Sequence, residues 1–223
     1  MFNRNLISWR PARPAAVLLG LASLCAPALI AQKFEVGGGG GGPLYLSRPV
    51  RTPTVSANTG FDNGFAFGGW VGHDTTDRIG GEIHYLHGRN DLKLSSGGTK
   101  INFSGLSHAL HYDVLVYGAP RGAKIRPFVA VGGGIKGYYG TGKESAFQPL
   151  SNLALLTRTR QWQGLATFGG GVKVAVGRHS SLRFEVLDYL TPFPKDVIAP
   201  APGAKLGGWL HNFVPVVGLS ATF

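Results

Sequence analysis

The chain contains long stretches in which apolar residues occupy every second position. Between positions 182 and 190, for example, Leu182, Phe184 and Val186 alternate with Arg183 and Glu185. Because successive side chains of a β-strand point to opposite faces, this period of two predicts strands with one apolar face. Segments of this kind cover residues 34–42, 64–73, 78–88, 105–118, 124–138, 162–176, 182–190 and 209–223.

The connections between these eight segments alternate in length. The short ones hold the sequences DTTD, APRGA and GRHSS, whereas the long ones cover roughly 43–63, 89–104, 139–161 and 191–208. Short turns at one end and long loops at the other are typical of outer-membrane barrels. We therefore predict an all-β fold, an eight-stranded antiparallel up-and-down transmembrane β-barrel with lipid outside and a polar lumen. The alternative is a soluble lipocalin-like carrier, because the period alone does not say which face is inside.

The amino-terminal residues have the order of a secretory signal peptide. Arg4, Arg10 and Arg13 form a positive region, residues 15–24 are apolar, and small residues follow up to Ala31. The apolar run is too short for a membrane helix, so we predict export with cleavage after Ala31.

Cleavage divides the chain into a signal peptide, residues 1–31, and a barrel domain, residues 32–223. It removes Cys25, the only cysteine, so the mature chain has no disulfide, thiolate catalyst or cysteine metal ligand. It also removes three arginines and no acidic residue, which lowers the formal net charge from +11 to +8. A basic exported chain favours an anionic lipid surface over nucleic acid as its partner. We expect no cofactor and a monomer.

The last residues, VVGLSATF, resemble the assembly signal of bacterial outer-membrane barrels, with Gly218, a hydrophobic residue at Ala221 and a terminal aromatic at Phe223. Over residues 33–223 the chain is similar to small eight-stranded barrels of the OmpA and OmpX type, the outer membrane protein beta-barrel domain family. The resemblance implies insertion by the barrel-assembly machinery and a location in the bacterial outer membrane. It implies little about activity.

A register can be proposed for the third and fourth strands. Residues 92–103 contain a Gly-Gly pair suited to a two-residue hairpin turn. Continuing that register places Glu82 opposite Asp113 and His84 opposite His111, with all four side chains in the lumen. The alternatives are a metal or proton site and a hydrogen-bonded polar patch. We expect the patch, because nothing in the spacing selects a coordination geometry.

The sixth and seventh strands add charges to the same lumen. A turn centred on His179 places Lys173 opposite Glu185, with Arg183 beside them. Such buried charges must pair, and eight strands leave room only for side chains, so we expect a plug of salt bridges rather than a solute pore. The predicted lumen cluster consists of Glu82, His84, His111, Asp113, Arg126, Lys173, Arg183 and Glu185.

Aromatic residues near the predicted strand ends suggest interfacial girdles. Trp70, Trp162, Trp209, Tyr138 and Tyr139 fall at such positions.

The four long loops are basic. Ten cations stand against four carboxylates, a net charge of +6. We predict a structural or surface-interaction role, through contact with outer-membrane lipid or lipopolysaccharide. The alternatives are a small pore and a lipid-modifying enzyme at the rim, for which Ser107 and His108 form the only comparable pair. The cations are Arg48, Arg51, Arg89, Lys93, Lys100, Lys143, Arg158, Arg160, Lys195 and Lys205, and the carboxylates are Asp62, Asp91, Glu144 and Asp196.

Overall fold

The computed structural model describes residues 33–145 and 147–223. The predicted signal peptide lies outside these residues, so its boundary with the barrel domain stays a prediction. Within the described part of the chain, no helix has the length and apolarity needed to cross a bilayer.

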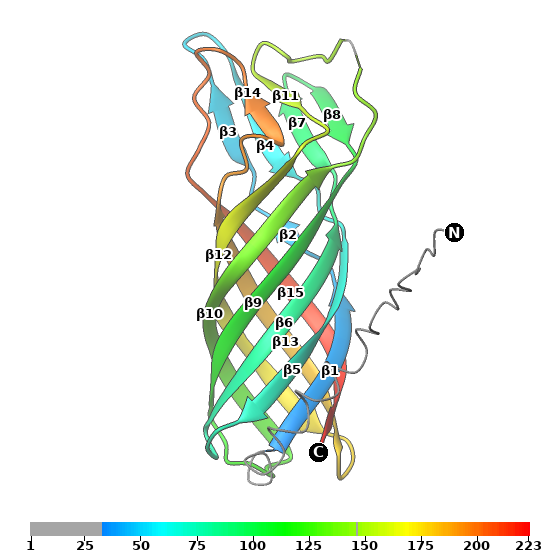
Figure 1. Ribbon diagram of the computed structural model, residues 1–223. Coiled ribbons are helices and arrows are strands. Elements are labelled where there is room, and N and C mark those ends of the chain that lie inside the picture. The colour runs from blue at the N-terminus through cyan, green and yellow to red at the C-terminus, as the bar shows by residue number, and fades with distance from the viewer. Residues whose placement is uncertain (1–32, 146) are drawn as a thin grey trace, which may run out of the picture. The chain divides into compact units, whose positions relative to one another are not determined.

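Eight long strands close into one antiparallel barrel (Figure 1). Consecutive long strands pair with each other, and the first pairs with the last, so the barrel sheet has no free edge. Strands of 9 to 16 residues suffice to cross a hydrocarbon core, which takes about 9–11 residues. The predicted eight-stranded up-and-down barrel is confirmed. Its strands are β1 (Lys33–Gly41), β5 (Phe65–Asp74), β6 (Ile79–Arg89), β9 (Gly105–Tyr117), β10 (Ile125–Gly140), β12 (Arg160–Ala175), β13 (Ser180–Pro192) and β15 (Trp209–Thr222).

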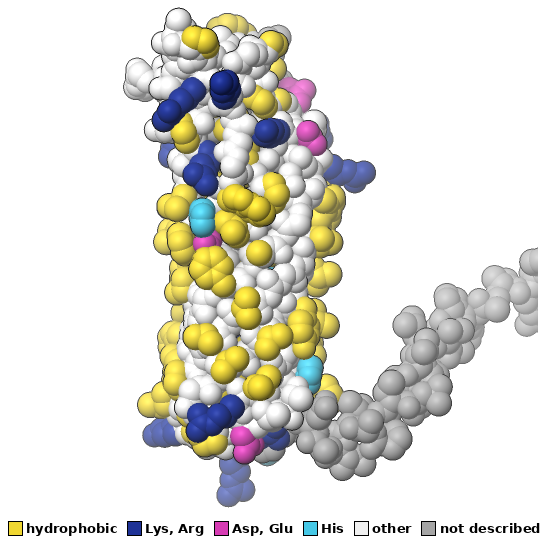
Figure 2. All heavy atoms as spheres, turned by 90° about the vertical axis from the view of Figure 1, so that its left-hand side faces the viewer, with side chains coloured by type: hydrophobic (Ala, Val, Ile, Leu, Met, Phe, Trp, Pro, Cys, Tyr) yellow, Lys and Arg dark blue, Asp and Glu magenta, His cyan; other side chains and the backbone are white. Residues whose placement is uncertain are grey.

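The two faces of the barrel wall differ as the sequence pattern predicts. On β10, Ile125, Val129 and Val131 are about 60% exposed (59%, 61% and 60%), while Arg126 and Phe128 between them are buried. Figure 2 shows the apolar side chains spread over the middle of the barrel surface, with Lys and Arg side chains gathered toward its two ends. An apolar outside with charges inside is the inverse of a soluble carrier and suits a barrel immersed in lipid.

The four long connections form a folded cap at one end of the barrel (Figure 1). From the sequence alone these connections are predicted only as long loops. Their strands make a four-stranded sheet in the order β3-β4-β7-β8 and a two-stranded sheet of β11 and β14, while β2 pairs with the outer end of β15. The cap strands are β2 (Leu44–Tyr45), β3 (Arg48–Arg51), β4 (Ser56–Phe61), β7 (Leu92–Ser96), β8 (Thr99–Phe103), β11 (Ala154–Leu156) and β14 (Ile198–Pro200).

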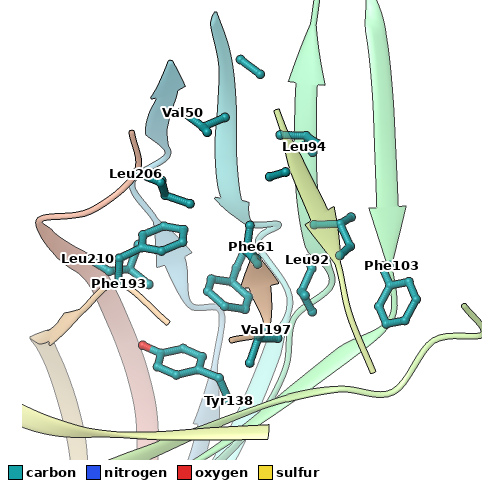
Figure 3. Close-up of a cluster of buried hydrophobic side chains, with 14 of the residues drawn as sticks. Val50, Phe61, Leu92, Leu94, Phe103, Tyr138, Phe193, Val197, Leu206 and Leu210 are labelled. Atoms are coloured by element: carbon teal, nitrogen blue, oxygen red, sulfur yellow. The ribbon is translucent and has the colours of Figure 1, made fainter. Parts of the chain in front are cut away.

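The cap has its own hydrophobic core (Figure 3). Each long connection contributes fully buried side chains, represented by Val50, Leu92, Leu156 and Val197. Burying an aliphatic side chain of this size stabilises by roughly 1.5–3 kcal/mol, so the cap holds together by the same physics as a soluble domain.

The hairpin predicted within residues 92–103 is confirmed. Leu94 pairs with Ile101, and Leu92 pairs with Phe103. Gly97 and Gly98 have φ angles of 54° and 84°, the left-handed region that a two-residue turn of this kind requires.

The prediction that Trp70 belongs to an interfacial aromatic girdle is wrong. Its side chain is only 4% exposed and lies in the lumen, and Tyr138 is also fully buried, whereas Trp162 and Trp209 are about half exposed. The lumen accommodates the indole because the neighbouring β1 and β15 carry glycine beside it: a Cβ atom at Gly37 or Gly218 would overlap the ring. Successive side chains of a strand point to opposite faces, so Trp70, next to exposed Val71, points into the lumen.

Closure of the barrel uses a first strand that consists largely of glycine. Glycines 37–41 of β1 pair with residues 216–220 of β15, and the Phe223 amide donates a hydrogen bond to the Phe34 carbonyl at 2.8 Å. Gly218, the glycine of the terminal motif, pairs with Gly39, and a Cβ atom at Gly218 would overlap the Trp70 ring. The terminal strand therefore pairs with a stretch of the first strand that has no side chains.

We expect Gly37→Ala to destabilise the barrel by about 1–3 kcal/mol, because the new methyl group overlaps the indole of Trp70 in a packed interior. The measurement is thermal unfolding of the purified barrel in micelles, followed by the gel shift between folded and boiled protein. Gly164→Ala is the matched control, since a Cβ atom there meets nothing within 4 Å. Equal unfolding temperatures for the two variants would contradict the packing argument.

Candidate functional site: the lumen network and the basic cap

Glu82 on β6 is the centre of the lumen network. Its carboxylate is 2% exposed and accepts hydrogen bonds from Lys173 Nζ at 2.6 Å, Arg183 Nη1 at 2.5 Å and His84 Nε2 at 2.9 Å. Three strands, β6, β12 and β13, therefore meet at one carboxylate. A charge buried in a low-dielectric interior needs such partners to remain ionised.

The network extends from Glu82 in two directions. Arg183 donates from Nε and Nη2 to Glu185 Oε2, at 2.8 and 2.6 Å. Lys173 donates to Glu35 Oε2 at 2.8 Å and to the Tyr117 hydroxyl at 2.9 Å. Glu35 was missing from the predicted cluster. Its position next to lipid-facing Val36 on β1 is the signal that would have placed it inside.

A second group of polar side chains adjoins the first. Glu82 pairs with Asp113 and His84 pairs with His111, which confirms the predicted register. His111 contacts Asp113 Oδ1 through Nδ1 at 3.1 Å and the Tyr189 hydroxyl through Nε2 at 2.8 Å. The rings of His84 and His111 are stacked with centroids 4.9 Å apart. Two imidazoles and two carboxylates thus share one buried volume.

The register predicted for the sixth and seventh strands is wrong by two residues. Lys173 pairs with Arg183, not with Glu185. The cause is a tighter turn: the amides of Val176 and Gly177 both donate to the Ser180 carbonyl, which centres the hairpin on Arg178. Because a shift of two leaves each side chain on its face, all three charges still lie in the lumen.

Arg126 lies opposite Lys173 in the pairing of β10 with β12 but forms its ion pair outside the rest of the predicted cluster. It donates to Asp74 Oδ2 at 2.6 Å and to the Asp77 carbonyl at 2.9 Å, near the short turns. Its guanidinium lies 3.4 Å from the centre of the Tyr117 ring, which separates it from Lys173. Arg126 therefore forms no ion pair with Glu82 or Asp113.

The outer end of the lumen is filled by aromatic rings. Tyr45, Phe61 and Tyr138 stack with centroid distances of 5.1 and 4.9 Å, and Lys136 donates to the Tyr45 hydroxyl at 3.2 Å. These rings belong to the hydrophobic core of the cap. The cap core and the barrel lumen are thus one continuous packed interior.

The basic surface of the cap is mostly uncompensated. Asp62 accepts from Lys93 at 3.1 Å and Lys100 at 3.0 Å. Partial burial opposes its ionisation, but the hydrogen bonds and positive charges of these two lysines lower the pKa of Asp62 below its ordinary value. Within residues 33–145 and 147–223, these are the only two of the ten cap cations within 4.0 Å of a carboxylate. Arg48 donates to the Trp209 carbonyl, and the exposed remainder are Arg51, Arg89, Lys143, Arg158, Arg160, Lys195 and Lys205.

Comparison with known proteins agrees with this geometry. Residues 16–199 match the Outer membrane protein beta-barrel domain family. The chain belongs to this family. Membership places the protein in the bacterial outer membrane, with insertion through its strands. The match ends before β15, so the terminal strand is described by the structure alone.

Two solved structures share the fold. The outer membrane protein OprG from Pseudomonas aeruginosa superposes with a TM-score of 0.57 at 11% identity, covering 86% of this chain and 96% of its own. Neisserial surface protein A superposes with a TM-score of 0.51 at 10% identity, covering 85% of this chain and 97% of its own. No curated protein sequence matches the chain. At these identities the likeness concerns the barrel and not a specific activity.

We expect Arg183→Met to destabilise the barrel by about 3–5 kcal/mol, because it leaves Glu82 and Glu185 buried without their shared cation. Urea unfolding in micelles, read by tryptophan fluorescence, measures the change. Arg178→Met is the control, since Arg178 is exposed in the turn between β12 and β13 and should change stability by less than about 0.5 kcal/mol. Equal losses in both variants would show that the lumen network is not the source of stability.

Proposed function

We propose that this protein is a closed outer-membrane barrel whose role is surface interaction. Its folded basic cap binds the anionic groups of lipopolysaccharide or of outer-leaflet lipid. The observation that supports the proposal is that a barrel with a filled lumen bears a cap whose exposed cations mostly have no carboxylate partner. We propose that this role involves no catalysis.

The filling of the lumen argues against a solute pore. Toward the short turns the interior holds the ion pairs of Glu82, Lys173 and Arg183, and the outer end holds packed aromatic rings. Gly132 and Gly134 face the lumen and have no side chains, but they do not open a space there. A Cβ atom at either position would overlap the main chain of β9. An ion crossing this interior would have to break several buried ion pairs.

The geometry of Ser107 and His108 argues against a lipid-modifying enzyme at this pair. Ser107 is 4% exposed in the interior, where its hydroxyl donates to Asn90 at 2.9 Å. His108 lies on the opposite face of β9 and contacts the Tyr85 hydroxyl at 2.7 Å. A nucleophile and its general base must lie within hydrogen-bond reach, which a strand wall between them prevents.

Neutralising the cap tests the proposal. We expect the triple variant Arg51→Gln, Lys143→Gln and Lys195→Gln to bind lipopolysaccharide vesicles about 100-fold more weakly, at about 1 kcal/mol per cation. The measurement is surface plasmon resonance with the barrel held in nanodiscs of zwitterionic lipid, at low and high salt. Raising the salt should weaken binding of the unmodified chain, because exposed charges are screened.

The matched control removes the same charge from the other end. Arg78, Lys124 and Arg178 are exposed at the short turns, and their substitution by Gln should leave binding unchanged. If both triple variants lose binding equally, net charge rather than the cap is responsible. If neither loses it, the proposed interaction is wrong.

We further expect the folded chain to show no discrete conductance steps in planar lipid bilayers, because its lumen is filled. Heat-denatured protein from the same preparation serves as the baseline. Reproducible single-channel steps from the folded form alone would replace the surface-interaction role with that of a small pore.

A further inference from the structure

We propose that the lumen contains a binding site for one divalent transition-metal ion of the zinc class, with His84, His111 and Asp113 as ligands. The three side chains are buried and come from the facing strands β6 and β9. One ligand atom from each lies within 4.8 Å of the others. Ligands of a tetrahedral ion with bonds of about 2.0–2.1 Å lie about 3.4 Å apart. To close the site, the two imidazole rings, now stacked at an interplanar angle of 16°, must turn so that both lone pairs point at the ion.

The hydrogen bonds of the two imidazoles leave the nitrogens that a metal needs. His84 Nε2 is held by Glu82 Oε2 at 2.9 Å, and His111 Nε2 is held by the Tyr189 hydroxyl at 2.8 Å. A proton on each Nε2 leaves the lone pair on Nδ1. Metal-binding histidines in proteins are oriented in this way, by an oxygen acceptor on the nitrogen that does not bind the ion.

Asp113 supplies an oxygen that has no other partner. Its residue is fully buried, and its Oδ1 accepts from the Thr167 hydroxyl at 2.5 Å while contacting His111 Nδ1. Its Oδ2 is buried without any hydrogen-bond partner. An unsatisfied buried carboxylate oxygen is costly, and a cation is the ligand that best satisfies it.

The carboxylates around the proposed site outnumber the cations that pair with them. Four carboxylates, those of Glu35, Glu82, Glu185 and Asp113, stand against two cations, Lys173 and Arg183. Arg126 is paired with Asp74, whereas Lys136 has no carboxylate within 4.0 Å among the described residues and its Nζ lies 5.3 Å from the centre of the Tyr189 ring. With neutral imidazoles and a charged Lys136, these groups sum to −1, an excess of carboxylate charge that a bound cation offsets.

A small cavity adjoins the proposed site. It has a volume of about 10 Å³, is lined by His84, Trp70, Glu185 and Tyr189 among others, and has room for one water-sized particle. Of the three proposed ligands, only His84 lines this cavity, so the space lies on the His84 side of the site. Two imidazoles and one carboxylate favour zinc over calcium or magnesium, which prefer oxygen ligands.

The experiment uses protein purified from outer membranes, unfolded in urea with a chelator, and refolded into micelles with or without Zn²⁺. Bound zinc is counted by mass spectrometry after removal of free metal, and its ligands are identified by X-ray absorption. We expect one zinc per chain, with two imidazole nitrogens and a carboxylate oxygen at about 2.0–2.1 Å. The zinc-loaded form should also unfold at a higher temperature.

The variants distinguish the lumen site from the outer surface. His84→Gln with His111→Gln keeps an amide near each Nε2 position but removes both Nδ1 ligands, so zinc should be lost. His87 and His108 form a second histidine pair on the same two strands, on the lipid-facing side with ring centroids 4.8 Å apart. His87→Gln with His108→Gln should keep zinc. Tyr189→Phe removes only the hydrogen bond to His111 and should weaken binding about 10- to 100-fold.

Four results would overturn the proposal. The first is absence of bound zinc in the unmodified chain, and the second is its loss in the His87–His108 variant but not in the His84–His111 variant. The third, which needs no variant to fold, is an absorption spectrum of the unmodified chain without two imidazole ligands. If nitrogen NMR shows both lumen imidazoles doubly protonated in the presence of zinc, protons supply the missing charge and the metal site is wrong.

Discussion

The ion pairs that Lys173 and Arg183 make with Glu82 are the interaction on which the rest of the structure depends. A barrel in lipid has no water outside its wall, and side chains fill this lumen, so the charges of the interior must pair with one another. Meeting this condition fixes which strands come together and which face of each strand points inward. It also explains the glycines of β1 and β15, because the Trp70 ring beside Arg183 needs the space that Gly37 and Gly218 leave.

Most of the barrel could be predicted from the sequence because a wall with two different faces imposes a period of two. Each strand that crosses the membrane repeats the pattern over many residues, so the eight segments and their alternating connections stand out. The cap could not be predicted in the same way. Its strands are as short as two or three residues, and side chains such as Val50 and Val197 become buried only when separate loops meet. Such contacts leave no local pattern.

In the lumen cluster, the alternation of side chains between the two faces of a strand predicts which residues point inward but not which residues they contact. The error at Lys173 was a shift of two residues, which preserves the face, so the membership of Arg183 and Glu185 was unaffected. Trp70 was misplaced because an aromatic residue in a strand suits both a girdle and a lumen, and its neighbours decide. Partners from distant strands, such as Tyr189 beside His111, depend on the curvature of the closed sheet, about which the sequence pattern says nothing.

The carboxylate-rich lumen and the cation-rich cap are separate regions of the protein. The central lumen holds an excess of carboxylates over cations, whereas the cap exposes cations that have no carboxylate nearby. The stacked rings of Tyr45, Phe61 and Tyr138 lie between these regions. Through such an apolar layer the cap cations cannot pair with the lumen carboxylates, so each region must find its own counter-charge. In the lumen the proposed metal ion would supply that charge, and at the cap the proposed anionic lipid or lipopolysaccharide would supply it.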